Sequence, residues 1–81
     1  MIKVGDYVRV LENPPPSYSM YWNPQMDRFK GKICKITKVK QHHSIYLFNL
    51  RALNLNGYDS WNFVEEWLVK LLEEEALAYL I

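Results

Sequence analysis

Cysteine and histidine are the side chains of this sequence best suited to metal binding or to nucleophilic catalysis. Cys34 is the only cysteine, and His42 and His43 are the only histidines. A zinc site normally needs three or four ligands at recognisable spacings, and adjacent histidines in a strand would point to opposite faces. We therefore expect a polar turn at the two histidines, a small buried apolar side chain at Cys34, and no metal or other cofactor.

Other residue arrangements that support catalysis are also missing from the sequence. No pair of carboxylates is placed to share a cleft, and no nucleophile is accompanied by a base and an orienting group. The three glycines leave little for a loop that cradles phosphate. The sequence therefore predicts a binding protein and not an enzyme.

An aromatic loop over residues 12–27 is the first candidate for a binding surface. Pro14-Pro15-Pro16 excludes a helix and favours polyproline II, and Asn23-Pro24 is a further breaker of regular structure. The aromatic candidates between these breakers are Tyr18, Tyr21 and Trp22. Tyrosine and tryptophan are enriched among the residues that dominate protein interfaces, but the same rings could instead fold back to cap a small core.

Two later aromatic residues are candidate neighbours of this surface, Tyr58 and Trp61. For Trp61, and also for Trp67, packing in the core is the favoured alternative. A protein partner is therefore expected to contact mainly the aromatic loop.

A run of lysines is the second candidate surface, and it consists of Lys30, Lys32, Lys35, Lys38 and Lys40. These side chains could follow a phosphate backbone, or they could solubilise the outer face of a strand and protect its edge. Nucleic-acid binders are usually far more basic than a chain whose net charge is +1. We therefore favour the solubilising role and keep RNA or DNA binding as the alternative.

Charge is distributed unevenly along the chain. Residues 28–58 carry seven bases and no acid, whereas residues 59–81 carry six acids and one lysine. The molecule is a strong dipole if the fold keeps these halves on different faces, and it is partly neutralised if the fold pairs them. The sequence leaves both arrangements open.

Short strands are expected to position these residues. Alternating apolar residues predict a strand over residues 7–11 and another over 33–40, with Gly31 at the bend before it. A one-residue slip in the pattern near Thr37 predicts a bulge. The nearly continuous apolar run 45–50 predicts a central strand that is covered on both sides, and polar turns are expected at residues 41–44 and 51–60.

The last segment fits two patterns. Residues 61–81 could form one amphipathic helix. Alternatively, residues 61–63 form a short strand, 64–68 a helical turn, 69–72 the closing strand and 73–80 a short helix. We choose the second pattern because of the resemblance described next.

A pattern similar to the KOW motif is formed by Gly5-Asp6-x-Val8-x-Val10 and, after a loop, Phe29-x-Gly31-Lys32-x-x-x-Ile36-x-x-Val39. KOW segments belong to small SH3-like barrels of ribosomal and transcription-elongation proteins, although Cys34 stands where they usually carry glycine. The ending resembles a wider group of small SH3-like barrels common in phage and mobile-element genomes, through Trp61-x-Phe63-x-Glu65-Glu66-Trp67-Leu68.

The resemblance implies a mainly β fold. We expect one domain over residues 1–81, built as a five-stranded SH3-like small β-barrel with one helical turn before the last strand. Residues 73–81 are expected to form a tail with an optional short helix. The family implies an adaptor or binding role, with a host protein as partner if the chain comes from a phage or mobile element.

Composition adds the remaining expectations. A lone cysteine favours a reducing, cytoplasmic compartment, and no export signal is recognisable at the N-terminus. No apolar run approaches the ~18 residues of a membrane span. Apolar residues near the C-terminus predict self-association as a third role, namely Leu77, Tyr79, Leu80 and Ile81.

Overall fold

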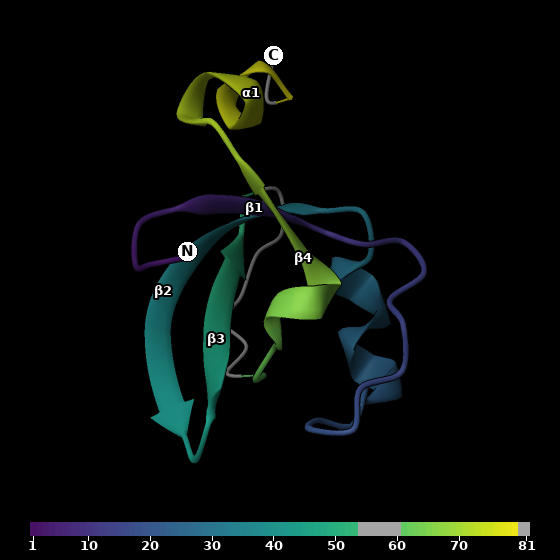
Figure 1. Ribbon diagram of the computed structural model, residues 1–81. Helices are drawn as coiled ribbons and strands as arrows, with labels where there is room; N and C mark the ends of the chain where they lie inside the picture. The colour runs from purple at the N-terminus through teal and green to yellow at the C-terminus, as the bar shows by residue number, and fades with distance from the viewer. Residues whose placement is uncertain (54–60, 80–81) are drawn as a thin grey trace.

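A computed structural model describes residues 1–53 and 61–79 as a mainly β structure with short helices (Figure 1). The elements are β1 (Tyr7–Val10), the 3-10 helix η1 (Pro24–Phe29), β2 (Ile33–His42), β3 (Ile45–Ala52), the 3-10 helix η2 (Glu65–Trp67), β4 (Leu68–Leu71) and α1 (Glu73–Ala78). The four strands form one antiparallel sheet in the order β3-β2-β1-β4. None of the helices in the described ranges is long and apolar enough to cross a membrane.

The long strand β2 connects the two halves of the sheet. Its first residues pair with β1 and also with β3, whereas its later residues pair with β3 alone. The pairing register shifts between Ile36 and Lys38, which confirms the bulge predicted near Thr37, and the Thr37 hydroxyl donates to the Asn49 carbonyl at 3.2 Å. Gly31, at φ +72°, makes the predicted bend before β2.

Strand β3 is not central in the sheet, which corrects the position expected from its sequence. It lies at one end of the strand order, yet residues 47–50 are all buried. Buried Asn49 shows how its outer side is covered, because its Nδ2 donates to the Trp61 carbonyl at 2.9 Å and to the Asn62 side chain at 3.0 Å. The burial of this strand was therefore predicted correctly, but its central position was not, because residues 61–63 adjoin its outer edge through this polar contact and one bridge.

Residues 61–63 form a single bridge and not a full strand. Phe63 and Phe48 exchange two backbone hydrogen bonds, of 2.8 and 2.9 Å, as an isolated antiparallel bridge. The described sheet is therefore open, with four strands. The aromatic side chains of this bridge are both buried in the hydrophobic core.

The aromatic loop contains regular structure that the sequence interpretation missed. Asn23-Pro24 begins the helix η1 because the Asn23 side chain accepts a hydrogen bond from the Gln25 amide at 2.9 Å and proline suits the first helical position. The helix buries Met26 and Phe29 in the core. The irregular part of the loop is therefore shorter than residues 12–27.

The C-terminal segment contains the predicted helical turn, closing strand and terminal helix, with a bridge at Phe63 in place of the predicted first strand, and the alternative of one helix over residues 61–81 is wrong. Helix η2 places Trp67 and Leu68 in the core, and Leu68 pairs with Val10 as the chain enters β4. Helix α1 then stands off the body at the top of Figure 1. The observed bounds differ from the predicted ones by one or two residues, and the hairpin turn after β2 shortens to residues 43–44.

Glycine 31 supplies the first test of the fold. We expect Gly31→Ala to lower the free energy of unfolding by about 1–2 kcal/mol, because alanine is strained at positive φ and its Cβ would lie 3.1 Å from Glu12 Cγ. The matched control is Gly5→Ala, which has the same kind of strain at φ +91° but no atom within 4 Å. Denaturant titration should show a smaller loss for the control; equal losses would mean that Glu12 simply moves aside.

Candidate functional site

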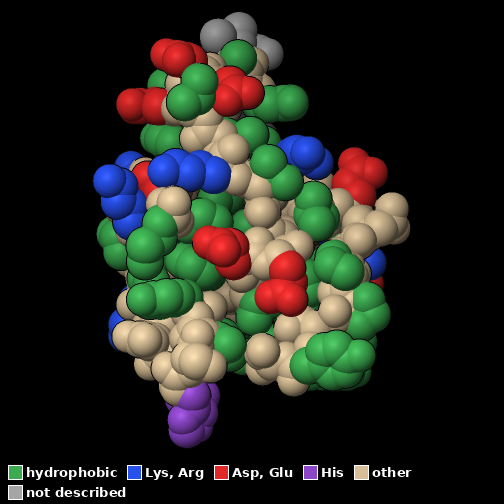
Figure 2. All heavy atoms as spheres, viewed as in Figure 1, with side chains coloured by type: hydrophobic (Ala, Val, Ile, Leu, Met, Phe, Trp, Pro, Cys, Tyr) green, Lys and Arg blue, Asp and Glu red, His purple; other side chains and the backbone are tan. Residues whose placement is uncertain are grey.

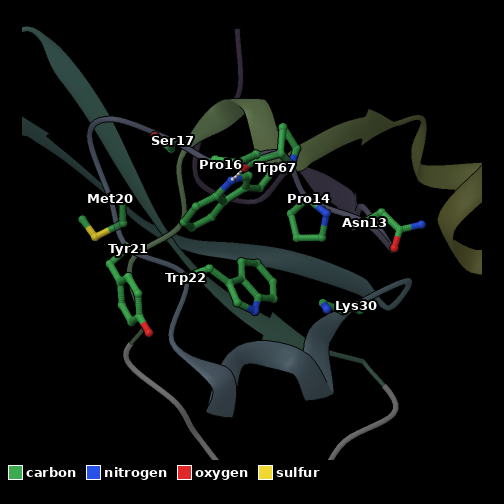
Figure 3. A pocket seen from close by; sticks show the side chains of 10 residues that line it. Asn13, Pro14, Pro16, Ser17, Met20, Tyr21, Trp22, Lys30 and Trp67 are labelled. Carbon is green, nitrogen blue, oxygen red and sulfur yellow. Dashed lines mark hydrogen bonds between the residues drawn. The ribbon is translucent and has the colours of Figure 1, made fainter.

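A groove lies between the aromatic loop and helix η2 (Figure 3). Its volume is about 430 Å³, and its walls are residues 13–17 and 20–22, together with Lys30 and Trp67. We call it the loop groove. It contains the triple proline on one side and the aromatic residues Tyr21 and Trp22 on the other.

Four aromatic rings form a cluster beneath the loop groove. Trp22 lies edge-on to Trp67, with ring centroids 5.1 Å apart, and edge-on to Phe63 at 5.9 Å. Phe63 in turn contacts Phe29 at 5.5 Å and Trp67 at 6.2 Å. Such perpendicular pairs add a modest attraction to the burial of apolar area. The cluster attaches the loop to the core through Trp22.

The triple proline is attached separately, through Trp67. The indole Nε1 of Trp67 donates to the Pro15 carbonyl at 2.7 Å, and the ring itself has no exposed surface. The backbone carbonyl of Trp67 also accepts from the Leu11 amide at 3.0 Å. One residue of η2 therefore holds the beginning of the loop at two points.

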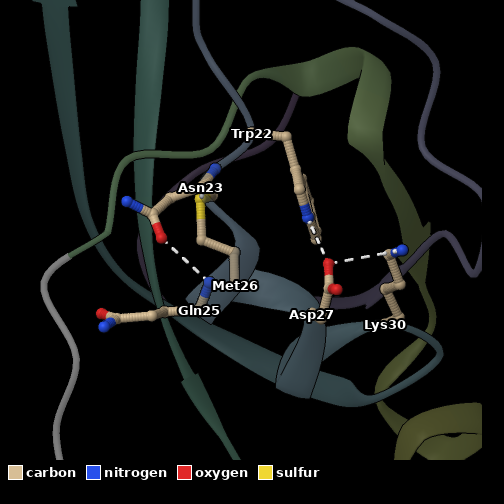
Figure 4. A network of polar contacts seen from close by, with 6 residues as sticks. All are labelled: Trp22, Asn23, Gln25, Met26, Asp27 and Lys30. Atoms are coloured by element: carbon tan, nitrogen blue, oxygen red, sulfur yellow. Dashed lines mark hydrogen bonds and ion pairs between the residues drawn. The ribbon is translucent and has the colours of Figure 1, made fainter.

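A polar network fixes the other end of the loop (Figure 4). Trp22 Nε1 donates to Asp27 Oδ1 at 2.6 Å, and Lys30 Nζ lies 3.3 Å from the same oxygen. The Trp22 hydrogen bond, with a further contribution from Lys30, holds the pKa of the Asp27 carboxyl below its usual range. Lys30 Nζ also lies 5.8 Å from the centre of the Trp22 ring, at the outer range of a cation–π contact.

Four of the five aromatic residues predicted as a contact surface lie in the described ranges, and the structure does not bring them all together. Tyr21 and Trp22 line the loop groove, and the fully exposed Tyr18 lines a neighbouring hollow with Pro16 and Ser17. Trp61 does not line the groove, since it is half-buried and packs against the core. Tyr58 lies outside the described residues.

Both interpretations of the loop aromatics apply, each to different residues. Trp22 folds back onto the core, as the capping alternative expected. Tyr21, by contrast, is 75% exposed, and Tyr18 is exposed completely. The rings available to a partner are therefore those of the two tyrosines, presented on a loop that Trp22 holds in place.

Sequence reasoning missed the contributions of Pro15, Asp27 and Trp67 to this site. The triple proline was considered only as a breaker of regular structure, although a proline carbonyl remains a free acceptor. The spacing of Asp27 and Lys30 was a usable signal, since residues three apart are neighbours on a helical turn. No local pattern predicts the pairing of Trp67 with Pro15, because these residues are far apart in sequence.

The predicted lysine surface is also divided. Lys30 belongs to the loop groove, whereas Lys40 is half-buried beside a different hollow with Leu47 and His42. The exposed members are Lys32, Lys35 and Lys38. Lys35 lies 5.4 Å from the centre of the Tyr7 ring and directly opposite Arg51 on β3.

Cys34 is buried as the sequence predicted, whereas of the two histidines expected in a turn only His43 lies there, because β2 extends through His42. Cys34 is fully buried, and burial raises the pKa of its thiol to about 12. His43 occupies the hairpin turn at φ +56°, with its ring 4.3 Å from that of His42 at the end of β2. Within residues 1–53 and 61–79, no three side chains of His, Cys, Asp or Glu are grouped as metal ligands.

Replacing Trp67 tests the attachment of the triple proline. We expect Trp67→Phe to lower the free energy of unfolding by about 2–3 kcal/mol, since it leaves the Pro15 carbonyl without its donor and opens a space in the aromatic cluster. The matched control is Trp22→Phe, in which the half-buried indole loses a bond to an exposed carboxylate, and we expect about 1 kcal/mol or less. Equal losses in denaturant titrations would contradict the central role of Trp67.

The polar network makes a prediction about pH. We expect Trp22→Phe to raise the pKa of Asp27 toward the ordinary value of about 4, because the hydrogen bond that favours the carboxylate is lost. The stabilisation from this carboxylate is present above that ordinary pKa and is lost as the pH falls through the lowered value. An NMR titration of the carboxyl carbon measures the shift.

Asp6 is the internal control for this titration. Its pKa is also lowered, by the Lys3 amide and by Lys70, and neither group contacts Trp22. The Asp6 titration should therefore not change in Trp22→Phe. An unchanged Asp27 titration would show that the indole does not stabilise the carboxylate.

Comparisons of this chain with protein-family models, with curated proteins and with solved structures found no match. The loop groove and the side chains exposed around it are therefore the features of the molecule that bear on its function.

Proposed function

We propose that this protein is a non-catalytic protein-binding module whose contact surface is the aromatic loop. The observation that carries this proposal is the contrast between an anchored loop and its exposed rings. Tyr18 and Tyr21 are exposed, while Trp22 and Trp67 attach the same loop to the core. A surface that is already ordered loses less conformational entropy when it binds.

The chemistry of the surface fits a protein partner. Tyrosine provides a large, rigid contact area with a hydroxyl that can form hydrogen bonds. The loop groove beside Tyr21 adds apolar proline and tryptophan walls, with Lys30 at its edge. Two further aromatic residues are proposed as peripheral members of this surface: Trp61, which is half-buried, and Tyr58, which lies outside the described residues. If the chain comes from a phage or mobile element, as the resemblance implies, the partner is a host protein.

We propose further that the fold is a KOW-type, SH3-like small barrel. The strand order β4-β1-β2-β3 supports this, because the bridge at Phe63 continues the sheet beyond β3 and η2 then leads the chain back into β4. The bulge in β2 supports it too, since bulges bend strands toward closure. In this proposal, residues 61–63 act as a fifth, very short strand.

A second candidate function is RNA or DNA binding through the exposed lysines. It is supported by the like charges of Lys35 and Arg51, which lie opposite each other on neighbouring strands. Phosphate binding weakens steeply with salt, whereas an aromatic protein interface weakens little. The two candidates therefore differ in a property that is simple to measure.

Capture of partners with paired variants tests the function. The tagged chain is incubated with lysate at low and high salt, with and without nuclease, beside Tyr18→Ala/Tyr21→Ala and the charge control Lys32→Ala/Lys38→Ala. We expect to capture a partner protein that stays bound at high salt and binds the lysine variant as tightly as the wild type. It should bind the tyrosine variant at least about 30-fold more weakly, which is the loss typical of one interface hot spot. All four substituted side chains are exposed, so the variants should fold.

The opposite pattern would reverse the ranking of the two functions. Loss of binding in the lysine variant, together with release by salt or nuclease, supports the nucleic-acid function. Equal binding by all three proteins at high salt would show that the aromatic loop is not the contact surface.

A further inference from the structure

The C-terminal arm, which we define as residues 72–79, is poorly covered by the rest of the chain. Leu72 is 61% exposed, Leu77 42% and Tyr79 63%, whereas Ala76 is buried. Helix α1 has six residues, and isolated helices shorter than about 12–15 residues are marginal in water. The arm therefore exposes apolar side chains on a helix that the body supports mainly near Ala76.

The arm is also strongly acidic. Glu73, Glu74 and Glu75 are all exposed and occupy its first helical turn. Figure 2 shows acidic side chains around the projecting end of the molecule and basic side chains on the body below it. The arm thus combines three negative charges with three exposed apolar side chains.

A complementary surface lies on the sheet. Lys35 faces Arg51 across β2 and β3, and Lys38 follows on the same strand beyond the bulge; all three are exposed. We call these three residues the basic strip. Like charges directly opposite each other destabilise a sheet, so an anion bound at the strip would relieve a cost that the isolated chain bears.

Among residues 1–53 and 61–79, no ion pair involves the arm or the basic strip. The ion pairs seen between described residues join Lys30 to Asp27 and Lys70 to Asp6. The charge asymmetry of the sequence is therefore not neutralised by ion pairs between these two surfaces of one molecule.

We propose that the arm of one molecule binds the basic strip of a second copy, and that the reciprocal contact forms a two-fold symmetric dimer. The three acids of the arm match the three bases of the strip, and a two-fold axis uses each surface once per molecule. The exposed apolar side chains of the arm would cover the aliphatic stems of the lysines. The Tyr7 ring beneath Lys35 adds apolar area at the same place.

A second copy explains more of the structure than nucleic acid does at this surface. Nucleic acid would neutralise the strip but would leave Leu77 and Tyr79 exposed and would be repelled by the three glutamates. The dimer uses both charged surfaces and the apolar side chains together. It is independent of the aromatic loop, so it can fail while the proposed function holds.

Charge exchange between two variants tests the dimer. Sedimentation equilibrium of the nuclease-treated full chain, from about 1 μM to about 1 mM, should show a monomer–dimer equilibrium that weakens with salt. Glu73→Lys/Glu74→Lys and Lys35→Glu/Arg51→Glu should each raise the dimer Kd at least about tenfold. Glu75 is kept because its Oε1 accepts a hydrogen bond from the Leu72 amide at 3.0 Å and caps α1. An equimolar mixture of the two variants should dimerise again.

Glu65→Lys/Glu66→Lys is the matched control, because these glutamates are also exposed but lie on η2. It should dimerise like the wild type. Tryptophan fluorescence reports whether each variant is folded. If a reversal variant is unfolded, Leu77→Ser/Tyr79→Ser is used in its place and should weaken the dimer at least about tenfold as well. A monomer throughout, a dimer unaffected by reversal, or a mixture that stays monomeric overturns the proposal. If the chain carries nucleic acid before nuclease treatment, and Lys35→Glu/Arg51→Glu does not, the basic strip binds nucleic acid and the dimer proposal is overturned.

Discussion

The hydrogen bond from the Trp67 indole to the Pro15 carbonyl links the two parts of the chain on which the candidate surface depends. Trp67 is fully buried at the end of η2, immediately before β4. The sheet therefore fixes the position of Trp67, and the hydrogen bond to Pro15 fixes the loop relative to Trp67. Without this link, a segment containing three consecutive prolines would have few backbone donors of its own with which to attach itself.

The anchor also explains how an 81-residue chain can present a long loop in an ordered state. A chain of this size buries only about 60% of its unfolded surface, so it has little stability to spare. The loop and the helix η1 place Met26 and Phe29 in the hydrophobic core, and Trp22 packs against it. Its ordering thus adds to the stability of the fold, and the exposed tyrosines are positioned as a consequence.

Much of the fold could be predicted from the sequence because the signals were local. The bulge near Thr37 and the bend at Gly31 each follow from a few neighbouring residues. The helical turn before β4 was chosen over one long helix because of the resemblance, since the local pattern fitted both. The edge position of β3 could not be predicted from local pattern. Its buried Asn49 is satisfied by Trp61 and Asn62, which come from a distant segment of the chain. The start of η1 was missed because Asn23-Pro24 is typical both of a breaker and of a helix N-terminus.

The candidate site was predicted less completely, for a related reason. Residue type alone identified Tyr18 and Tyr21 as candidate contact residues, because tyrosine is enriched among the residues that dominate protein interfaces. The distinction between exposed tyrosines and an anchoring Trp22 depends on the rings of Phe63 and Trp67, which come much later in the chain. Lys30 was grouped with the other lysines by spacing, whereas Asp27 in fact holds it at the groove.

The burial of Cys34 gives the molecule a built-in reporter of its own opening. The residue lies between its partners Val8 on β1 and Ala52 on β3, and it has no exposed surface. A buried thiol can react with an alkylating reagent only when the neighbouring strands separate and expose it. The rate at which Cys34 is alkylated would therefore report how often the neighbouring strands separate, without any added label.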